Sequence, residues 1–494
     1  MTTHSVNVHS SKRKKNLTKS TKARHRRSAK SGRSEAKERV FESTDTGNAE
    51  ALAHLFGDRL RYVPAWKTFI HFNGTHWRED VGNVAMLKLS KRVIDNMPAG
   101  RWKAASQKRP RREAMIALAK GEIASIEPEH LDADPLLFGV RNGVLDLRTG
   151  KLRPHRPEDL ITKIAPVDFD PKAKAPRWEK FLREIQPQGA VRDFLQRNFG
   201  YALSGEVGER IVVVLLGAGR NGKSLLLRTL QSVMGPYAKT TAAELLMVKD
   251  HSAHPTEIAD LFGVRLAVSS EIKKGRTFDE EQVKRLCGDD RLKARRMRED
   301  FWEFDPTHKI VIAANHKPRV RDTTDSFWDR FRLVMFNVRI ADKKVNTRLR
   351  AEMLQERSGI LNWLLRGYLA FRRRGLVPPK AVLDATKAYR TREDVLGQFL
   401  EEHCAFDLAT ARVSAADLLA RATKWAAPLN FHAPSAKTLA ERLEEKGCTS
   451  KHTNRGNVWL GVRLKPEPTK KPAKKKAGKK ADKKRASREK GGQK

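Results

Sequence analysis

The sequence predicts an α/β protein built around a parallel β-sheet, and two observations carry that prediction. The first is a glycine-rich turn that follows an apolar strand and opens a segment of helical periodicity, in IVVVLLGAGRNGKSLLLRTLQSVMG, residues 211–235. The second is a set of three further apolar segments downstream that alternate with polar, helix-compatible ones. Strands that alternate with helices in this way are typical of a parallel sheet covered by helices.

The glycine-rich turn fits the pattern G-x-x-x-x-G-K-[ST] in the strand–turn–helix context that this pattern requires. Backbone N–H groups of such a P-loop surround phosphate oxygens, and the helix that follows directs the positive end of its dipole at them. Lys223 would contact the β- and γ-phosphates of ATP, and Ser224 would bind Mg²⁺. The turn therefore predicts a nucleotide site formed by Gly217, Ala218, Gly219, Arg220, Asn221, Gly222, Lys223 and Ser224.

Basic residues are in large excess in this chain of 494 residues, with 100 Lys and Arg against 58 Asp and Glu. The formal net charge is +42, and much of it lies at the two ends. Residues 1–40 hold 13 basic and 2 acidic residues, and residues 465–494 hold 14 and 3. Both tails lack the apolar residues that a core needs and are predicted to be disordered. The body is basic as well, which favours a nucleic-acid partner.

Cysteine usage and hydropathy exclude several protein classes. The three cysteines, Cys287, Cys404 and Cys448, are far apart in the sequence, so a zinc site and a disulfide framework are not expected. Apolar runs stay well below the roughly 18 residues of a membrane span, and the N-terminus lacks the apolar segment of a signal peptide. We expect a cytoplasmic protein with no membrane partner.

The region before the P-loop, residues 41–185, is expected to mix helices and short strands. A capped helix from Thr44 precedes two strands joined at Asn73-Gly74, a strong hairpin signal. Basic helices over 82–130 precede three strands within 134–166, with turns at Asn142-Gly143 and Gly150. Two helices, RWEKFLREI and VRDFLQRNFGYAL, then lead to the P-loop strand.

The predicted ATPase core spans 186–345, and its further strands are VRLAVSSEI, HKIVIAAN and FRLVMFNVRI. A helical connector is expected over 346–394, with one amphipathic helix that ends at Gly375. Residues 395–464 contain three helical segments and then two strands around a polar turn. This order predicts a winged-helix-like, DNA-binding domain, and a helical cap on the ATPase is the alternative.

Three residues after the P-loop are candidates for the hydrolysis itself. Glu271 and Asn315 each end an apolar strand, where a side chain at the carboxyl edge of a parallel sheet faces the phosphates. Glu271 could polarise water or hold the shell of Mg²⁺, and Asn315 could hold the attacking water. Arg330, with Arg332 beside it, could stabilise the transition state as an arginine finger from a neighbouring subunit. A solvent-facing acid and an Asn-initiated turn are the alternatives for the first two.

The segment between these two strands predicts a basic hairpin. From Asp290 it shows two strands with a turn near Glu299-Asp300. Such a hairpin could hold a phosphate backbone, although charge runs more often form solvated faces. The basic residues that it carries are Lys293, Arg295, Arg296 and Arg298.

Taken together, residues 44–464 resemble the superfamily 3 helicase core of phage and plasmid primase-helicases, a group that includes the poxvirus-type enzymes. The resemblance rests on NGVLDLRTGKLRPHRPEDLITK, on the P-loop, on the run from His254 to Val334 and on YRTREDVLGQFLEEHC. It implies an AAA+-like ATPase that assembles as a homohexameric ring and moves 3′ to 5′ on single-stranded or forked DNA to open the duplex during phage or plasmid replication. We expect it in the cytoplasm of a bacterial host cell, associated with the nucleoid. By position it assigns Lys223, Glu271, Asn315 and Arg330 to catalysis.

The sequence departs from the family in three ways. Leu286-Cys287-Gly288-Asp289-Asp290 stands where L-T-G-G-D is usual, and Met335 replaces a proline after the finger. No polymerase-like domain precedes residue 44, so we expect no primer synthesis by this chain alone and a separate primase as a partner. An origin-binding initiator that does not unwind DNA processively is the main alternative, and a non-enzymatic DNA-coating protein is a weaker one.

Overall fold

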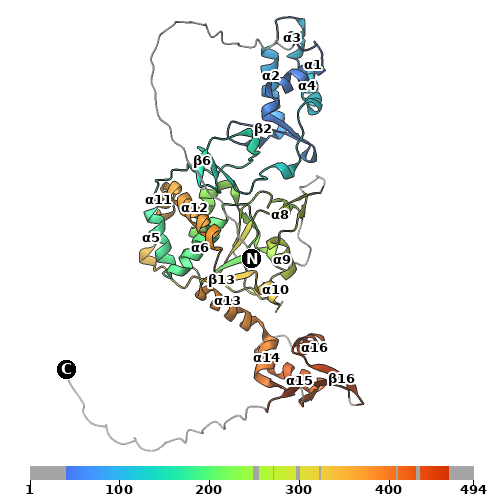
Figure 1. The fold of residues 1–494 in the computed structure, drawn as a ribbon, viewed down its shortest axis with the longest axis vertical. Helices are drawn as coiled ribbons and strands as arrows, with labels where there is room; N and C mark the ends of the chain where they lie inside the picture. The colour runs from blue at the N-terminus through green and yellow to red at the C-terminus, as the bar shows by residue number, and fades with distance from the viewer. Residues whose placement is uncertain are drawn as a thin grey trace, which may run out of the picture.

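The computed structural model describes residues 40–248, 255–270, 272–295, 301–321, 324–407, 410–429, 434–454 and 456–466. These residues form three parts in chain order: an N-terminal region, a central α/β core and a C-terminal module (Figure 1). Almost all of the two basic tails lies outside the described residues. The prediction of disorder therefore stays a prediction.

The N-terminal region begins with four helices beside a three-stranded antiparallel sheet. Thr44 caps the first helix, because its hydroxyl accepts a hydrogen bond from Gly47 N at 3.0 Å. The Asn73-Gly74 turn joins two strands as predicted, but Leu60–Val63 adds a third strand that the sequence did not indicate. The elements are α1 (Asp45–Phe56), β1 (Leu60–Val63), β2 (Thr68–Phe72), β3 (Trp77–Glu79), α2 (Val84–Asp95), α3 (Arg101–Ser106) and α4 (Arg109–Glu122).

A second antiparallel sheet and two helices connect this region to the core. The strands β4 (Leu137–Val140), β5 (Gly143–Asp146) and β6 (Lys151–Arg153) turn where Asn142-Gly143 and Gly150 predict. The helices α5 (Pro176–Ile185) and α6 (Gly189–Tyr201) follow. The three predicted strands and the two predicted helices of this stretch are therefore confirmed.

The central sheet is five-stranded and wholly parallel, in the order β13-β7-β12-β9-β8. The predicted strands are all present, although the last one ends at Met335 rather than 340. The edge strand β8, AKTT, was not predicted, because it is polar and only its pairing with β9 makes it a strand. The strands are β7 (Val212–Leu216), β8 (Ala238–Thr241), β9 (Leu266–Ser270), β12 (Lys309–Ala314) and β13 (Phe331–Met335).

Helices cover both faces of this sheet (Figure 1). Successive residues of β7 alternate between the faces, as strand geometry requires. Val213 and Leu215 join a core with α6, α7 (Lys223–Met234) and α12 (Arg357–Arg374). Val212 and Val214 join a second core with α8 (Pro255–Ala259), α9 (Glu280–Cys287), α10 (Asp325–Trp328) and the hairpin β10 (Leu292–Ala294) and β11 (Trp302–Phe304).

The expected connector contributes to the core. In α12 a Cβ atom on Gly367 would lie 2.0 Å from Gln196 O, and one on Gly200 in α6 would lie 2.2 Å from Tyr368 N. The two helix backbones therefore touch at these glycines. The neighbouring helices are α11 (Leu349–Gln355) and α13 (Lys380–Glu393).

Two buried cations hold the end of α6 against the amino edge of the sheet. Arg265 donates to Leu203 O and, at 2.7 Å, to Leu137 O, and Lys309 donates to Ser204 O. Burial lowers the pKa of both side chains. Backbone carbonyls at the C-terminal end of a helix are favourable partners for such charges.

The C-terminal module contains three helices and two small sheets, in the order β15-β17-β16 and β14-β18. The three helices and the later hairpin of β16 and β17 are present as predicted. The strands β14 and β15, between the first two helices, and β18 were not predicted. The winged-helix assignment stays a prediction. Its elements are α14 (Val395–His403), β14 (Cys404–Phe406), β15 (Arg412–Ser414), α15 (Ala415–Ala426), α16 (Ala436–Glu445), β16 (Thr449–Thr453), β17 (Gly456–Leu460) and β18 (Val462–Leu464).

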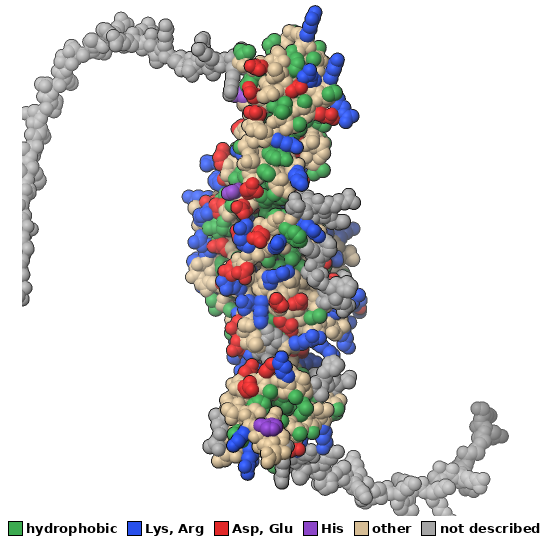
Figure 2. Space-filling view, turned by 90° about the vertical axis from the view of Figure 1, so that its right-hand side faces the viewer, with side chains coloured by type: hydrophobic (Ala, Val, Ile, Leu, Met, Phe, Trp, Pro, Cys, Tyr) green, Lys and Arg blue, Asp and Glu red, His purple; other side chains and the backbone are tan. Residues whose placement is uncertain are grey.

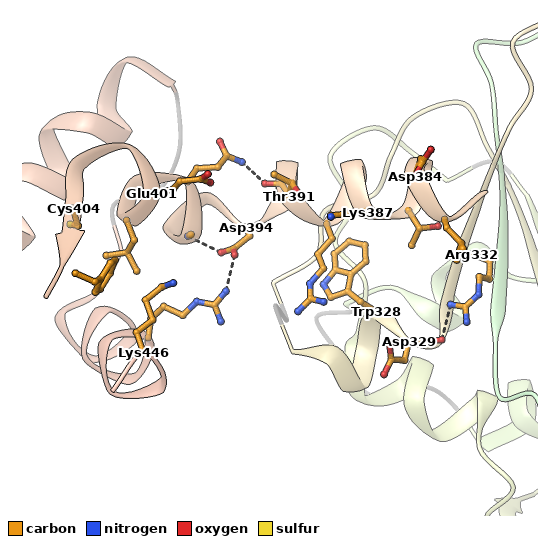
Figure 3. Close-up of a pocket in the computed structure, with 18 residues that line it drawn as sticks. Trp328, Asp329, Arg332, Asp384, Lys387, Thr391, Asp394, Glu401, Cys404 and Lys446 are labelled. Carbon is orange, nitrogen blue, oxygen red and sulfur yellow. Dashed lines mark hydrogen bonds and ion pairs between the residues drawn. The ribbon is translucent and has the colours of Figure 1, made fainter. Parts of the chain in front are cut away.

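A cavity of about 910 Å³ separates the core from this module (Figure 3). Asp394 joins the two sides: it accepts from Gly397 N at 2.8 Å, which caps α14, and from Arg442 of α16 at 2.7 Å. Arg332 lines the core side of the cavity, and Lys446 lines the module side. No P-loop residue lines it.

Lys and Arg side chains lie along the whole face drawn in Figure 2, from the N-terminal helices to the C-terminal module, with Asp and Glu among them. Among the described residues, no helix combines the length and the apolar character that a membrane crossing requires.

Candidate active site

The P-loop lies at the carboxyl edge of the sheet, between the end of β7 at Leu216 and the start of α7 at Lys223. Its backbone adopts the left-handed region at Gly219 (φ +94°), Arg220 (φ +52°) and Gly222 (φ +80°). Glycine enters this region at little cost, which explains two of the three positions. β7 lies between β12 and the edge strand β13, so the loop projects from an inner strand of the sheet.

Two glycines of the loop are required by close contacts as well. A Cβ atom on Gly217 would lie 2.4 Å from Phe336 O, and one on Gly222 would lie 2.4 Å from Ile185 Cγ2. The first contact is with the backbone after β13, and the second is with the lead-in helix α5. A larger residue at either position would therefore move the loop away from its support.

Lys223 is buried at the first position of α7. Its ammonium donates to Gly217 O at 2.7 Å, to Asn221 Oδ1 at 2.9 Å and to Asn315 Oδ1 at 3.3 Å. No carboxylate is among these partners, and burial lowers the pKa of Lys223 to about 8. The side chain is thus a desolvated cation that an anionic ligand would stabilise.

Asn315 reaches Lys223 because of strand register. Ala314 of β12 pairs with Leu216 of β7, and Gly217 N donates to Ala314 O at 3.2 Å. The residue after each strand therefore lies at the same edge of the sheet. The structure brings the predicted Lys223 and Asn315 together, and the water-positioning role of Asn315 stays a prediction.

The chemistry of the P-loop fits a nucleotide triphosphate with Mg²⁺. Ser224 is exposed at the second position of α7, where a hydroxyl can bind the metal and the first N–H groups of the helix have no intrahelical partner. Glu271, the other predicted metal and catalytic residue, lies outside the described residues. Ser270, which precedes it in the sequence, ends β9 at the same edge of the sheet.

We expect nucleotide affinity to fall as pH rises through about 8. A bound triphosphate favours the protonated ammonium form of Lys223. The affinity is therefore highest below the Lys223 pKa of about 8, and above it the affinity declines by up to about tenfold per pH unit. The measurement is the binding of a fluorescent ATP analogue between pH 7 and 9.5. In the Lys223→Arg variant the charge persists, and the affinity should be independent of pH. A constant wild-type affinity up to pH 9.5 would contradict the lowered pKa.

Arg330 lies at the opposite edge of the sheet from the P-loop. It precedes β13, its carbonyl accepts from Val212 N at 2.7 Å, and one guanidinium nitrogen donates to Ser326 O. Its Nε is buried and has no hydrogen-bond partner among the described residues. At about 3.3 Å per residue, the five residues of β13 put roughly 16 Å between Arg330 and the P-loop edge of the same chain.

The two strands of the predicted basic hairpin are present as β10 and β11, with Lys293 opposite Glu303, and the turn expected near Glu299-Asp300 lies outside the described residues. The outer face of the hairpin carries Phe301, a residue that is 50% exposed and whose ring centroid lies 5.1 Å from Lys293 Nζ and 4.7 Å from Arg295 Cζ. Arg296 and Arg298 lie outside the described residues. The described part of the hairpin thus combines an exposed ring with two cations, a combination suited to single-stranded nucleic acid.

The sequence did not predict the segment that supports the P-loop from the side. After β13 the chain runs along the loop: Phe336 O accepts from Asn221 Nδ2 at 3.3 Å, and Ile340 N donates to Arg220 O at 2.8 Å. Asp342 forms an ion pair with Arg220. No sequence motif indicates that this segment contacts the P-loop. The sequence analysis instead predicted a strand that continued to residue 340.

Two family models match consecutive parts of this chain. The family described as "D5 N terminal like" matches residues 49–187, and a family of unknown function, DUF5906, matches residues 215–330. The first match covers most of the N-terminal region and α5. The second runs from β7 to Arg330.

Several curated viral proteins are similar to this chain. "Putative helicase L207/L206" of Acanthamoeba polyphaga mimivirus is 28% identical over 64% of this chain and 36% of its own length. "Putative helicase 022R" of Frog virus 3 is 26% identical over 55% and 37%. "Putative primase C962R" of African swine fever virus is 26% identical over 41% and 22%.

The chain spans little more than a third of the length of the first two relatives. Among solved structures, the apo C-terminal region of NrS-1 aligns with a TM-score of 0.49 at 10% identity, over 85% of this chain and 100% of that one. Residues 49–187 thus match the D5 N terminal-like family, and the chain is similar to viral proteins that are named putative helicases and putative primases.

Proposed function

We propose that this protein is an ATP-dependent DNA helicase that works as a ring, moves 3′ to 5′ and uses Mg²⁺. The observation that carries the proposal is the contact between Lys223 and Asn315 at the mouth of the P-loop. A buried lysine that has no carboxylate partner among the described residues, beside a neutral amide from the adjacent strand, suits a site that binds and hydrolyses a triphosphate.

Bound MgATP would supply the phosphoryl group that water attacks. In the proposed mechanism Lys223 neutralises charge on the β- and γ-phosphates, and Ser224 binds the metal. Asn315 orients the attacking water, and Glu271 polarises it. Asn221 and the glycines keep the loop in shape, since Asn221 accepts from Lys223 and donates to Phe336 O.

A ring is proposed because Arg330 lies too far from the P-loop of its own chain to contact a phosphate bound there. The strand length of roughly 16 Å exceeds the reach of an arginine side chain, so a catalytic Arg330 must act on the site of a neighbour. The number of subunits, proposed as six, rests on the resemblance of the sequence alone.

DNA is the proposed polymer because the hairpin presents Phe301 between Lys293 and Arg295 and because the relatives carry helicase and primase names. Stacking on the ring and attraction of the phosphates would both act on a single strand. The curated relatives come from large DNA viruses. The phage or plasmid setting, the bacterial cytoplasm and the separate primase stay predictions.

The experiment is ATP hydrolysis and strand separation on a forked duplex with a labelled strand. We expect single-stranded DNA to stimulate hydrolysis and the fork to open only on the side with a 3′ tail. Because phosphate contacts release counterions, the stimulation should weaken steeply as salt rises.

Hydrolysis without opening of any fork would reject the helicase and favour an origin-binding initiator. That alternative predicts that residues 395–464 bind one duplex sequence far better than others. A protein that neither binds nor hydrolyses ATP would reject both.

A further inference from the structure

We propose that the N-terminal region positions the DNA-contacting hairpin, and that Trp66 is the positioning residue through which it does so. The proposal rests on the proposed function, because the hairpin must act on DNA for its position to matter. The contact lies at the inner face of the hairpin, away from the P-loop.

The two faces of the hairpin differ in character. Lys293 and Glu303 form a pair on the outer face. Leu292 and Phe304, which are buried, form a pair on the inner face, as do Ala294 and Trp302. Two strands of three residues have little stability alone, so packing of this inner face determines where the hairpin lies.

Aromatic rings from three separate parts of the chain meet at the inner face. The ring of Phe262, from the segment between α8 and β9, lies 4.8 Å from that of Trp302 and 5.5 Å from that of Phe304. The ring of Trp66 lies 6.0 Å from Phe262 and 6.5 Å from Trp302, edge to face in both cases. Trp66 belongs to the N-terminal region, in the turn between β1 and β2.

An ion pair makes a second connection between the same two parts. Arg291, which precedes β10, contacts Glu129 of the N-terminal region at 2.7 Å. Both side chains are about half exposed, at 46% and 48%, so this pair adds little stability and serves to test position. The ring contact and the ion pair together hold the base of the hairpin against the N-terminal region.

The contact has open space beside it. A cavity of about 710 Å³ is lined by Trp66 and Phe262 together with β3 and α8. The N-terminal region therefore contacts the core at the base of the hairpin, and the cavity lies beside that contact. A shift of the N-terminal region would reach the hairpin through Trp66, and DNA bound to the hairpin would act on the N-terminal region in return.

The test measures ATP hydrolysis against the concentration of a single-stranded oligonucleotide. We expect Trp66→Ala to raise the half-saturating DNA concentration by about fivefold or more, with basal hydrolysis unchanged. Trp66→Phe should behave like wild type, because a ring remains. Trp102→Ala, which removes a half-buried tryptophan of α3, is the matched control and should leave the half-saturating DNA concentration unchanged.

The ion pair between Glu129 and Arg291 allows a second, independent test by charge exchange. Glu129→Arg and Arg291→Glu should each raise the half-saturating concentration, and the double variant, which has the charges exchanged, should return towards wild type. If the double variant is as poor as the sum of the single ones, Arg291 acts on DNA directly or through Asp305, its other carboxylate partner at 3.7 Å, and the positioning role of the ion pair is wrong. If Trp66→Ala lowers basal hydrolysis and thermal stability in parallel, its role is only structural. A wild-type enzyme without any response to DNA would overturn the proposed function and this inference with it.

Discussion

Lys223→Ala is expected to reduce DNA-stimulated ATP hydrolysis by at least about 100-fold and to abolish opening of the fork. The ammonium is the buried positive charge at the mouth of the P-loop, where it contacts Gly217 O and Asn315 Oδ1. Without it, the phosphates lose the charge that stabilises them in the ground state and the transition state. Steady-state hydrolysis with saturating DNA measures the effect.

Two controls separate this loss from misfolding. Burial of the ammonium is unfavourable, as its lowered pKa indicates, so removal of the charge should leave the fold intact. MgATP should raise the unfolding temperature of the wild type and leave that of Lys223→Ala unchanged. Arg228→Ala, at an exposed position of the same helix, should keep full activity. Retained hydrolysis in Lys223→Ala would mean that the P-loop is not the catalytic site.

A mixture of Lys223→Ala and Arg330→Ala subunits is expected to regain hydrolysis that neither variant has alone. Loss of an arginine finger alone should lower the rate by about 10³-fold or more. In a randomly mixed ring, about a quarter of the sites would combine an intact Lys223 with an intact Arg330 from the neighbour. Hydrolysis measured after subunit exchange should approach that fraction of the wild-type rate.

The same design distinguishes Arg330 from its neighbour. Arg332 donates to the carbonyls of Asp329 and Phe331 and lines the cavity beside the C-terminal module. Arg332→Ala should therefore remain active. If the mixture stays inactive although the two variants assemble together, Arg330 acts within its own chain or only supports the fold.

Patterns of residues over short distances were enough for much of the fold. The P-loop, its strand and its helix follow from a motif whose backbone conformation needs glycine at Gly219 and Gly222. The Asn73-Gly74 and Asn142-Gly143 turns and the Thr44 cap follow from local side-chain chemistry. The edge strand β8 and the strand β1 did not follow, because neighbouring strands create them.

The sequence by itself determined which residues could bind phosphate, since the chemistry of Lys223 and Ser224 and the spacing of the glycines are local properties. Only the tertiary structure decided how those residues meet others. Strand register puts Asn315 against Lys223 and moves Arg330 to the far edge of the sheet. Packing puts Trp66 near Trp302, more than 200 residues along the chain. Such contacts depend on the order of strands and on the surfaces left to be buried, which no short stretch of sequence contains.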